Sequence, residues 1–238
     1  MNVQIFFSPR QKNPELWVKI LIVVNVIYYL ISLLVSYLLP GSTSIGFFSP
    51  TAQSLVNMGA SGSKHLFQAC MVHSLINANF LHVGIMHLLF NMVAFFQLFR
   101  PVCWSYGTDR ALVIYIGSGV FAFLCSAIMG IQLTVGASGA IFGLMGALLY
   151  YAKSRGDLAG KRLFKEIAFW AVLILVIGFM FAGVNNVAHL TGLIAGGTFG
   201  WFLGFRTGEN RKIVLVSNIC FFITFVCLLY PIVIIVQL

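Results

Sequence analysis

Two apolar segments of the chain begin with side chains that together could carry out acyl transfer. Ser138 stands in a Gly-Ala-Ser-Gly run, and His189 closely follows a pair of asparagines. A serine hydroxyl becomes a strong nucleophile when a histidine takes its proton, and the same histidine can then protonate a leaving amine. These residue types therefore predict acyl transfer, with Ser138 as the nucleophile and His189 as its general base and acid.

A third polar group could stabilise the oxyanion that such a reaction forms. His87 and Asn91 are four residues apart, so they share one face of a helix, and both side chains can donate a hydrogen bond. Ser138 begins its expected helix, where free backbone N–H groups can also bind an oxyanion. Gly139 would leave room beside the serine for the substrate carbonyl. We therefore expect an oxyanion hole made by His87, Asn91 and the Ser138 backbone.

The acidic residues of the chain narrow the mechanism. There are five of them, and all fall on the cytoplasmic side of the topology derived below: Glu15, Asp109, Asp157, Glu166 and Glu209. No carboxylate is therefore available as the third member of a Ser-His-Asp triad, and the expected arrangement is a Ser-His dyad. Another group must orient His189, and the ring of Phe142, one helical turn after Ser138, is the candidate.

The composition places these residues in a membrane. Of the 238 residues, 60% are hydrophobic and only 8% are charged, whereas a soluble domain carries roughly 25% charged residues. Such a chain cannot cover a water-facing surface, which excludes a soluble enzyme, a disordered chain and a nucleic-acid-binding protein. The five cysteines have neither metal-type nor disulfide-type spacing. We interpret them as small core or lipid-facing residues.

Seven stretches are candidate membrane helices, for which about 20 mostly apolar residues are needed. They are 20–39, 81–99, 111–129, 138–152, 167–183, 187–205 and 213–236. We expect an all-α, polytopic membrane bundle with a six-helix core over 1–205, a long outward loop over 41–80 and one additional helix over 213–236. No small-residue cleavage site follows the first stretch, so it is interpreted as a retained helix and not as a signal peptide.

The basic residues predict how these helices are oriented, because cytoplasmic loops carry an excess of Lys and Arg. The chain has 14 Lys and Arg residues, and all but Lys64 fall before the first helix or in the second, fourth and sixth connections. They are Arg10, Lys12, Lys19, Arg100, Arg110, Lys153, Arg155, Lys161, Arg162, Lys165, Arg206, Arg211 and Lys212. We expect a cytoplasmic N-terminus, an outward C-terminus and a location in the cell (inner) membrane. The net charge of +9 then reflects this orientation and anionic lipid.

The polar residues should share one layer of this membrane. An α-helix rises about 1.5 Å per residue, so the number of residues from the nearest cytoplasmic charge gives a depth. This depth is roughly 20 Å for His87, roughly 22 Å for Ser138 and roughly 25 Å for His189. The hydrocarbon core is about 30 Å thick, so these residues and Asn91 would lie together in its outer half. Polar residues inside a membrane are costly and mark functional sites by default. Helix packing alone does not require that a nucleophile and a base share one depth.

Glycines would bring the two helices of the dyad together. The 187–205 helix carries Gly192, Gly196, Gly200 and Gly204 at a spacing of four, and the 138–152 helix carries Gly139, Gly143 and Gly146. Faces of small residues let helix backbones approach closely inside a membrane. We therefore expect these two glycine faces to hold Ser138 against His189.

In these motifs the chain resembles the rhomboid family of intramembrane serine proteases. The likeness covers residues 81–204 and rests on three motifs in the family's order: His-Leu-Leu-Phe-Asn at 87–91 with His82 upstream, Gly-Ala-Ser-Gly at 136–139, and Ala-His with the glycine ladder from 188 to 204. It implies Ser138 and His189 as the catalytic dyad and His87 with Asn91 at the oxyanion hole. The expected supporting residues are Gly136, Gly139, Phe142 and His82.

The resemblance also implies partners and a topology. Substrates would be single-pass membrane proteins, cut after a small residue near the outer end of a helix, with water from an outward-facing cavity. The last helix is similar to the one that some members add to the six-helix core. The resemblance implies no cofactor and no metal. The segment 181–186 resembles the family's cap over the active site. Where the family has a Trp-Arg pair in the first outward loop, this chain has His73-Ser74, so loop roles are not carried over.

Each residue taken alone also has a less specific interpretation. A serine in a helix of small residues usually serves packing, and Asn and His often hydrogen-bond a neighbouring helix. We interpret His82 as structural, bonded to loop backbone or to a retained water, and His65 and His73 as interfacial. A zinc site is not expected, because His82 and His87 are five residues apart and no carboxylate or cysteine shares their depth.

Two other functions compete with proteolysis. The first is an inactive rhomboid-like protein that binds membrane helices, against which the intact Ser138 and His189 argue. The second is a transporter or receptor, which would have charges along a central path or an inverted repeat. The sequence has neither feature, and it predicts no oligomeric state.

Overall fold

The computed structural model describes residues 12–38, 48–181, 183–205 and 210–236, and in these ranges the regular structure is helical. The described part has seven helices of at least 18 residues. They are α1 (Pro14–Leu38), α5 (Ile85–Tyr106), α6 (Thr108–Ile128), α7 (Ser138–Arg155), α8 (Leu158–Met180), α9 (Asn186–Leu203) and α10 (Arg211–Val236). Each overlaps one of the seven apolar stretches expected from the sequence, in the same order.

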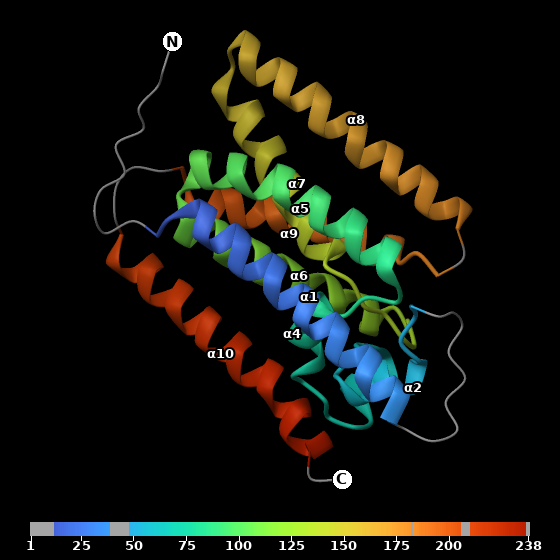
Figure 1. Cartoon of the computed structure of the whole chain (residues 1–238). Helices are drawn as coiled ribbons and strands as arrows, with labels where there is room; N and C mark the ends of the chain where they lie inside the picture. Colours follow the sequence, from blue (N-terminus) through green and yellow to red (C-terminus); the bar gives the residue numbers. More distant parts are fainter. Residues whose placement is uncertain (1–11, 39–47, 182, 206–209, 237–238) are drawn as a thin grey trace.

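The helices differ in how they are packed. By length and composition, α1, α5, α6, α8 and α10 could cross a membrane. α7 and α9 are the shortest of the long helices, and their sequences contain several glycines and polar residues. In Figure 1, α8 lies at one edge of the bundle and α10 at the opposite edge, with the other long helices between them. The helices that carry the candidate chemistry are therefore central, and the strongly apolar α8 and α10 are peripheral.

Several helix boundaries differ from the sequence expectation: α1 begins at Pro14 and α8 at Leu158, earlier than the expected stretches, and both ends of α5 differ. α5 begins at Ile85, after Gly84, so His82 precedes the helix and the prediction that it lies inside it was wrong. The same helix continues beyond residue 99 to Tyr106 because its last turns still bury Val102 and Tyr106. Apolar runs locate the part of a helix that lies in lipid, whereas hydrogen bonding and packing decide where the helix begins and ends.

The long loop is folded against the bundle. Its first residues, 41–47, lie outside the described part, and the remainder forms four short helices. They are α2 (Ala52–Asn57), α3 (Ser63–Phe67), α4 (Ser74–Asn77) and the 3-10 helix η1 (Ala78–Phe80). Leu66, Leu75 and Ala78 form a buried cluster with Phe123 and Ala127 of α6. A β-bridge between Ser61 and Thr134 also joins the loop to the segment before α7.

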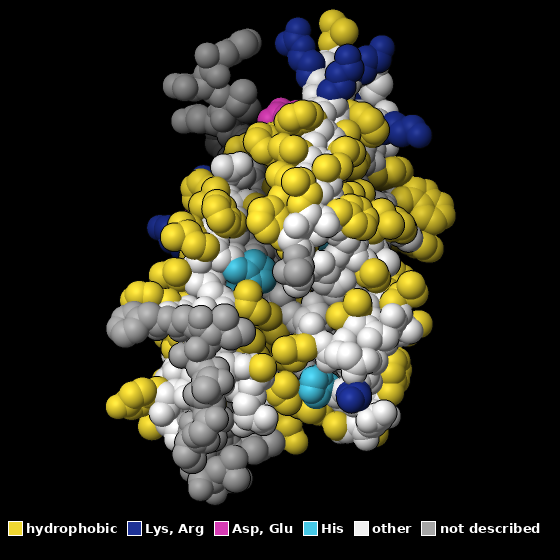
Figure 2. Space-filling view, turned by 90° about the vertical axis from the view of Figure 1, so that its right-hand side faces the viewer, with side chains coloured by type: hydrophobic (Ala, Val, Ile, Leu, Met, Phe, Trp, Pro, Cys, Tyr) yellow, Lys and Arg dark blue, Asp and Glu magenta, His cyan; other side chains and the backbone are white. Residues whose placement is uncertain are grey.

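Charged contacts gather at the end of the bundle that the sequence assigns to the cytoplasm. Lys12 Nζ lies 2.8 Å from Asp109 Oδ1, and Arg100 pairs with Glu15. Figure 2 shows most of the visible Lys and Arg side chains toward one end of the molecule, and hydrophobic side chains over much of its body. Arg10, Arg206 and Leu238, which bear on the expected orientation, lie outside the described residues.

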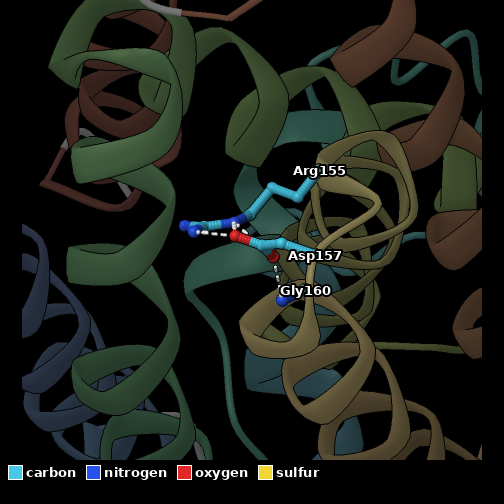
Figure 3. A network of polar contacts seen from close by, with 3 residues as sticks. All are labelled: Arg155, Asp157 and Gly160. Carbon is cyan, nitrogen blue, oxygen red and sulfur yellow. Dashed lines mark hydrogen bonds and ion pairs between the residues drawn. The ribbon is translucent and has the colours of Figure 1, made fainter.

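Asp157 joins α7 to α8 at this charged end. Its Oδ1 accepts a hydrogen bond of 2.7 Å from the Gly160 N–H and so caps α8. Arg155 Nη2 donates to Oδ2 at 2.6 Å, and Figure 3 shows the three residues together. The Arg155 guanidinium, and then the Gly160 N–H, lower the pKa of Asp157 to about 2.

The start of α8 should therefore lose protection in acid. The ordinary pKa of an aspartate carboxyl is 3.8, and a carboxylate whose pKa is lowered in the folded state stabilises the fold above that pH. This stabilisation is lost as the pH falls toward about 2. Hydrogen-exchange protection of the first-turn amides of α8 should fall across this range in the wild-type protein. Asp157→Asn keeps a capping oxygen but has no charge to lose, so an identical fall in this variant would contradict the assignment.

Candidate active site

The backbone before α7 places Ser138 at the first position of that helix. Gly136 has a φ of +127°, and a Cβ atom there would lie 2.7 Å from His87 Cε1. The Gly136 N–H donates to the Ala78 carbonyl at 2.8 Å. No side chain caps α7 at Ala137, so its first N–H groups remain available at the positive end of the helix dipole. Glycine at position 136 thus lets the turn pass close beside His87 immediately before the serine.

The serine and the histidine predicted to work together are in contact. His189 Nε2 lies 2.9 Å from Ser138 Oγ. Ser138 comes from α7 and His189 from the first turns of α9, which are far apart in the sequence. His189 is buried, while Ser138 keeps part of its surface exposed. This distance lies within the range over which a histidine can take a proton from a serine hydroxyl.

The glycine faces of α7 and α9 make this contact possible, as the sequence predicted. A Cβ atom at Gly196 would lie 1.8 Å from the Gly143 carbonyl oxygen, and one at Gly192 would lie 2.2 Å from that of Gly139. The prediction was wrong for Gly204, which lies beyond the last residue of α9 with a φ of +65° and has no neighbour within 4 Å of a built Cβ. It ends the helix, and the interface is made by the earlier glycines.

Gly139 serves helix packing in the structure. A Cβ atom at this position would lie 2.9 Å from the Ala122 Cβ and 3.6 Å from the Ala188 carbonyl oxygen. The space without a side chain is therefore occupied by α6 and α9. The expectation that it leaves room for a substrate carbonyl has no support in these contacts.

Phe142 lies where the sequence placed it, against the imidazole of His189. The two ring centroids are 4.4 Å apart and the ring planes differ by 9°, which is a stacked arrangement. Phe142 is buried, so its ring cannot turn away from the histidine without disturbing the core. The stacking fixes the plane of the imidazole but makes no hydrogen bond to it.

Asn186 supplies the hydrogen bond that the stacking lacks, and its role was missed in the sequence. Its Oδ1 lies 3.3 Å from His189 Nδ1, and its Nδ2 donates to the Leu175 carbonyl of α8 at 3.2 Å. Because a carbonyl only accepts, the amide nitrogen must face Leu175 and the amide oxygen must face the histidine. His189 Nδ1 then carries the proton, which leaves Nε2 free to accept the Ser138 hydroxyl. Gly178 permits this approach, since a Cβ there would lie 2.4 Å from Asn186 Oδ1.

Asn185 anchors the start of α9. Its Oδ1 accepts from the Ala188 N–H at 3.0 Å, and its Nδ2 donates to Ser126 Oγ at 2.9 Å and to Thr134 Oγ1 at 3.0 Å. These bonds tie the first turn of α9, and with it His189, to α6 and to the segment before α7. An asparagine immediately before a helix is a preferred N-cap, so the sequence contained a signal for the cap but none for the two hydroxyl partners.

The remaining predicted residues lie on and before α5. The His87 ring lies beside Gly136, close to the turn that carries Ser138. Asn91 is buried, and its Nδ2 donates to the His87 carbonyl at 2.8 Å, within its own helix. The fully buried ring of His82 contacts that of His87 edge-on, with centroids 5.0 Å apart. The structure thus places His87 beside the serine turn and His82 behind it, while the Asn91 amide is bonded locally.

Comparisons with known proteins agree with this architecture. The chain is 34% identical over 148 residues to the rhomboid protease GluP of Bacillus subtilis (strain 168), and the match covers 62% of this chain and 29% of GluP. It is 37% identical over 145 residues to the putative rhomboid protease YdcA of the same organism, covering 58% of this chain and 69% of YdcA. RHOMBOID-like protein 6, mitochondrial, of Arabidopsis thaliana is 32% identical over 160 residues, covering 66% of this chain and 52% of that protein.

A domain-level comparison covers the same region. Residues 69–206, more than half of the chain, match the Rhomboid domain. This range includes the helices that carry Ser138, His189, His87 and Asn91. Together with the apolar helices, the match identifies a multi-pass membrane protein, and the chain belongs to the rhomboid family.

Proposed function

We propose that this chain is an intramembrane serine endopeptidase that hydrolyses peptide bonds of single-pass membrane proteins through a Ser138–His189 dyad. The observation that carries the proposal is the 2.9 Å distance between Ser138 Oγ and His189 Nε2. The rhomboid family includes intramembrane serine proteases, and two of the relatives above are named as a protease and a putative protease. The family also has inactive members, so the dyad geometry is the stronger support for activity.

The proposed reaction begins with proton transfer within the dyad. His189 Nε2 takes the hydroxyl proton as Ser138 Oγ attacks the carbonyl carbon of the scissile peptide bond. The carbon–nitrogen bond then breaks, the imidazolium gives its proton to the leaving amine, and an acyl-enzyme remains. A water molecule, deprotonated by His189, attacks the ester carbonyl carbon. The bond to Ser138 Oγ then breaks, the imidazolium returns its proton to that oxygen, and the second fragment leaves with a new carboxyl group. The tautomer that Asn186 favours is the one required for the first step.

The tetrahedral intermediate would be stabilised at the N-terminus of α7. The uncapped N–H groups at this end point out of the helix. His87, whose ring lies beside Gly136, is the side chain best positioned to add a second donor. For Asn91 the proposal requires the amide group to keep a hydrogen available while it bonds the His87 carbonyl, which an NH₂ group with two hydrogens can do.

The proposed topology has seven spans, with α10 added to a six-helix core and the N-terminus in the cytoplasm. The charged contacts at one end of α1, α5 and α6 support a single cytoplasmic face. The N-terminal end of α7, which carries Ser138, lies at the opposite end of that helix from Lys153 and Arg155. His189 lies in the first turn of α9 and precedes Arg206 by 17 residues in the sequence. The site would then open outward in the cell (inner) membrane and take its water from that side. Single-pass substrates would reach it within the bilayer.

Asn186→Ala should lower kcat about tenfold or more and change KM little, because positioning the general base affects proton transfer and not substrate binding. The alanine removes the acceptor for His189 Nδ1 but leaves the Phe142 stacking in place. Thr191→Ala is the matched control on α9, since its hydroxyl bonds only the Val187 carbonyl of its own helix. Steady-state cleavage kinetics in detergent micelles or vesicles would measure both variants. An unchanged kcat for Asn186→Ala would remove Asn186 from the mechanism.

The proposed function is tested by reconstitution. The purified chain is placed in lipid vesicles with a panel of single-pass proteins that have small residues near the outer end of their helices. We expect at least one to be cut, with a new N-terminus that maps to that region. An inactive helix-binding protein would instead retain the substrates uncut, and this result across the panel with a folded protein would contradict the proposal.

A further inference from the structure

The last helix, α10, touches the rest of the bundle along a narrow stripe. Its described buried residues are Ser217, Thr224 and Pro231, which are seven residues apart and so lie on one face. Its other side chains are mostly exposed and apolar. Lipid is as apolar as these side chains, so burial of apolar surface does not hold such a helix in place, and specific contacts must do so.

One such contact joins α10 to α4. Proline has no N–H, so Pro231 leaves the carbonyl of Cys227, four residues earlier, without its helical donor. Asn77 Nδ2 donates to that carbonyl at 2.9 Å. Beside this bond, the His73 ring lies against Tyr230, with centroids 4.9 Å apart. The gap that Pro231 creates in α10 is therefore filled by a side chain from the folded loop.

Asn77 is also connected to the turn that carries the serine. It is fully buried and packs on Gly59, where a Cβ atom would lie 2.8 Å from Asn77 Nδ2. The next residue, Ala78, accepts a hydrogen bond of 2.8 Å from the Gly136 N–H. Gly136 lies two residues before Ser138 and lies against His87. A continuous set of short contacts thus runs from α10 through Asn77 to the serine turn.

We propose that Asn77 is a positioning residue through which α10 holds the serine turn, by fixing the Ala78 carbonyl that bonds Gly136. This inference rests on the proposed function, because it assigns α10 a part in the reaction of Ser138. When the Asn77 bond to Cys227 is absent, the Ala78 carbonyl and Gly136 can shift together, and Ser138 Oγ moves relative to His189. Small displacements of a nucleophile are costly because the reaction requires aligned atoms.

The test is the rate at which a fluorophosphonate probe labels Ser138 in the full chain. Asn77→Leu has nearly the same shape and no donor. We expect its labelling rate constant to fall about tenfold, with the labelled fraction at completion unchanged. Loss of the labelled fraction alone would indicate a purely structural role and overturn the proposal, as would an unchanged rate constant. Absence of labelling in the wild-type protein is a different result, which would contradict the proposed function itself.

Two further variants isolate the contribution of α10. Pro231→Ala restores an N–H that competes with Asn77 for the Cys227 carbonyl. The labelling rate constant of this variant should therefore fall, but less than that of Asn77→Leu. The double variant should be labelled no more slowly than Asn77→Leu alone. Ser217→Ala is the matched control, because it removes a contact to Lys12 at the other end of α10 and should label at the wild-type rate. No effect of Pro231→Ala would overturn the proposal even if Asn77→Leu did not fold. If Asn77→Leu folds, additive effects of the two substitutions would overturn it as well.

Discussion

Ser138→Ala should lower the rate of cleavage of a reconstituted single-pass substrate by about 10³-fold or more, because it removes the nucleophile and leaves only the groups that bind and polarise the peptide bond. The change deletes one oxygen from a partly exposed position, so the fold should be retained. His189→Ala should have a loss of the same order, and the double variant should be no slower than either single variant, since the two residues act as one unit.

The matched control for this variant lies on the same helix. Ser154 is exposed near the C-terminal end of α7, where its hydroxyl bonds the Tyr150 carbonyl. Ser154→Ala should therefore cleave at the wild-type rate. Time courses of product formation at equal amounts of folded protein measure all of these variants. Cleavage by Ser138→Ala at a rate close to that of the wild-type protein would remove the dyad from the mechanism.

Gly196→Ala should both destabilise the bundle and abolish most of its activity. The added methyl would lie 1.8 Å from the Gly143 carbonyl oxygen, a rigid backbone atom, so α7 and α9 must move apart. Overpacking of this kind costs about 1–3 kcal/mol. The separation acts directly on the hydrogen bond between Ser138 and His189, because these residues come one from each helix.

The adjacent glycine provides the control for this effect. A Cβ atom at Gly197 would have only ordinary contacts, the nearest being 3.5 Å from the Gly146 carbonyl oxygen. Gly197→Ala should therefore leave activity unchanged and, through the better helix propensity of alanine, leave stability unchanged or slightly raised. Thermal unfolding in detergent and cleavage rates compare the pair. Equal behaviour of the two variants would mean that the glycine face does not set the spacing of α7 and α9.

The sequence predicts several contacts of the candidate site because their signals are local. Ser138 and Phe142 are one turn apart on a single helix, and the glycine spacing of four is a helical pattern, so their shared face follows from periodicity alone. The absence of a carboxylate at the depth of His189 also follows from composition and topology. The contact between the two helices, and the stacking of Phe142 on the imidazole, are confirmed.

Contacts between distant segments could not be predicted in the same way. Asn186 bonds His189 within one helical turn, but its role depends on Leu175 and Gly178 of α8, whose approach no sequence pattern reveals. Gly139 was expected beside the substrate, yet Ala122 of another helix fills the space next to it. The apolar pattern also continued through the segment before α5, which hid the helix boundary that places His82 outside it.

The central claim is that Ser138 is a nucleophile activated by His189. The most direct measurement is reaction of the folded protein with a fluorophosphonate, followed by mass spectrometry of the labelled peptide. We expect a single covalent adduct on Ser138, and no adduct at that position in the same time with His189→Ala. A folded protein that stays unlabelled, or that cleaves substrate while carrying the adduct on another residue, would contradict it.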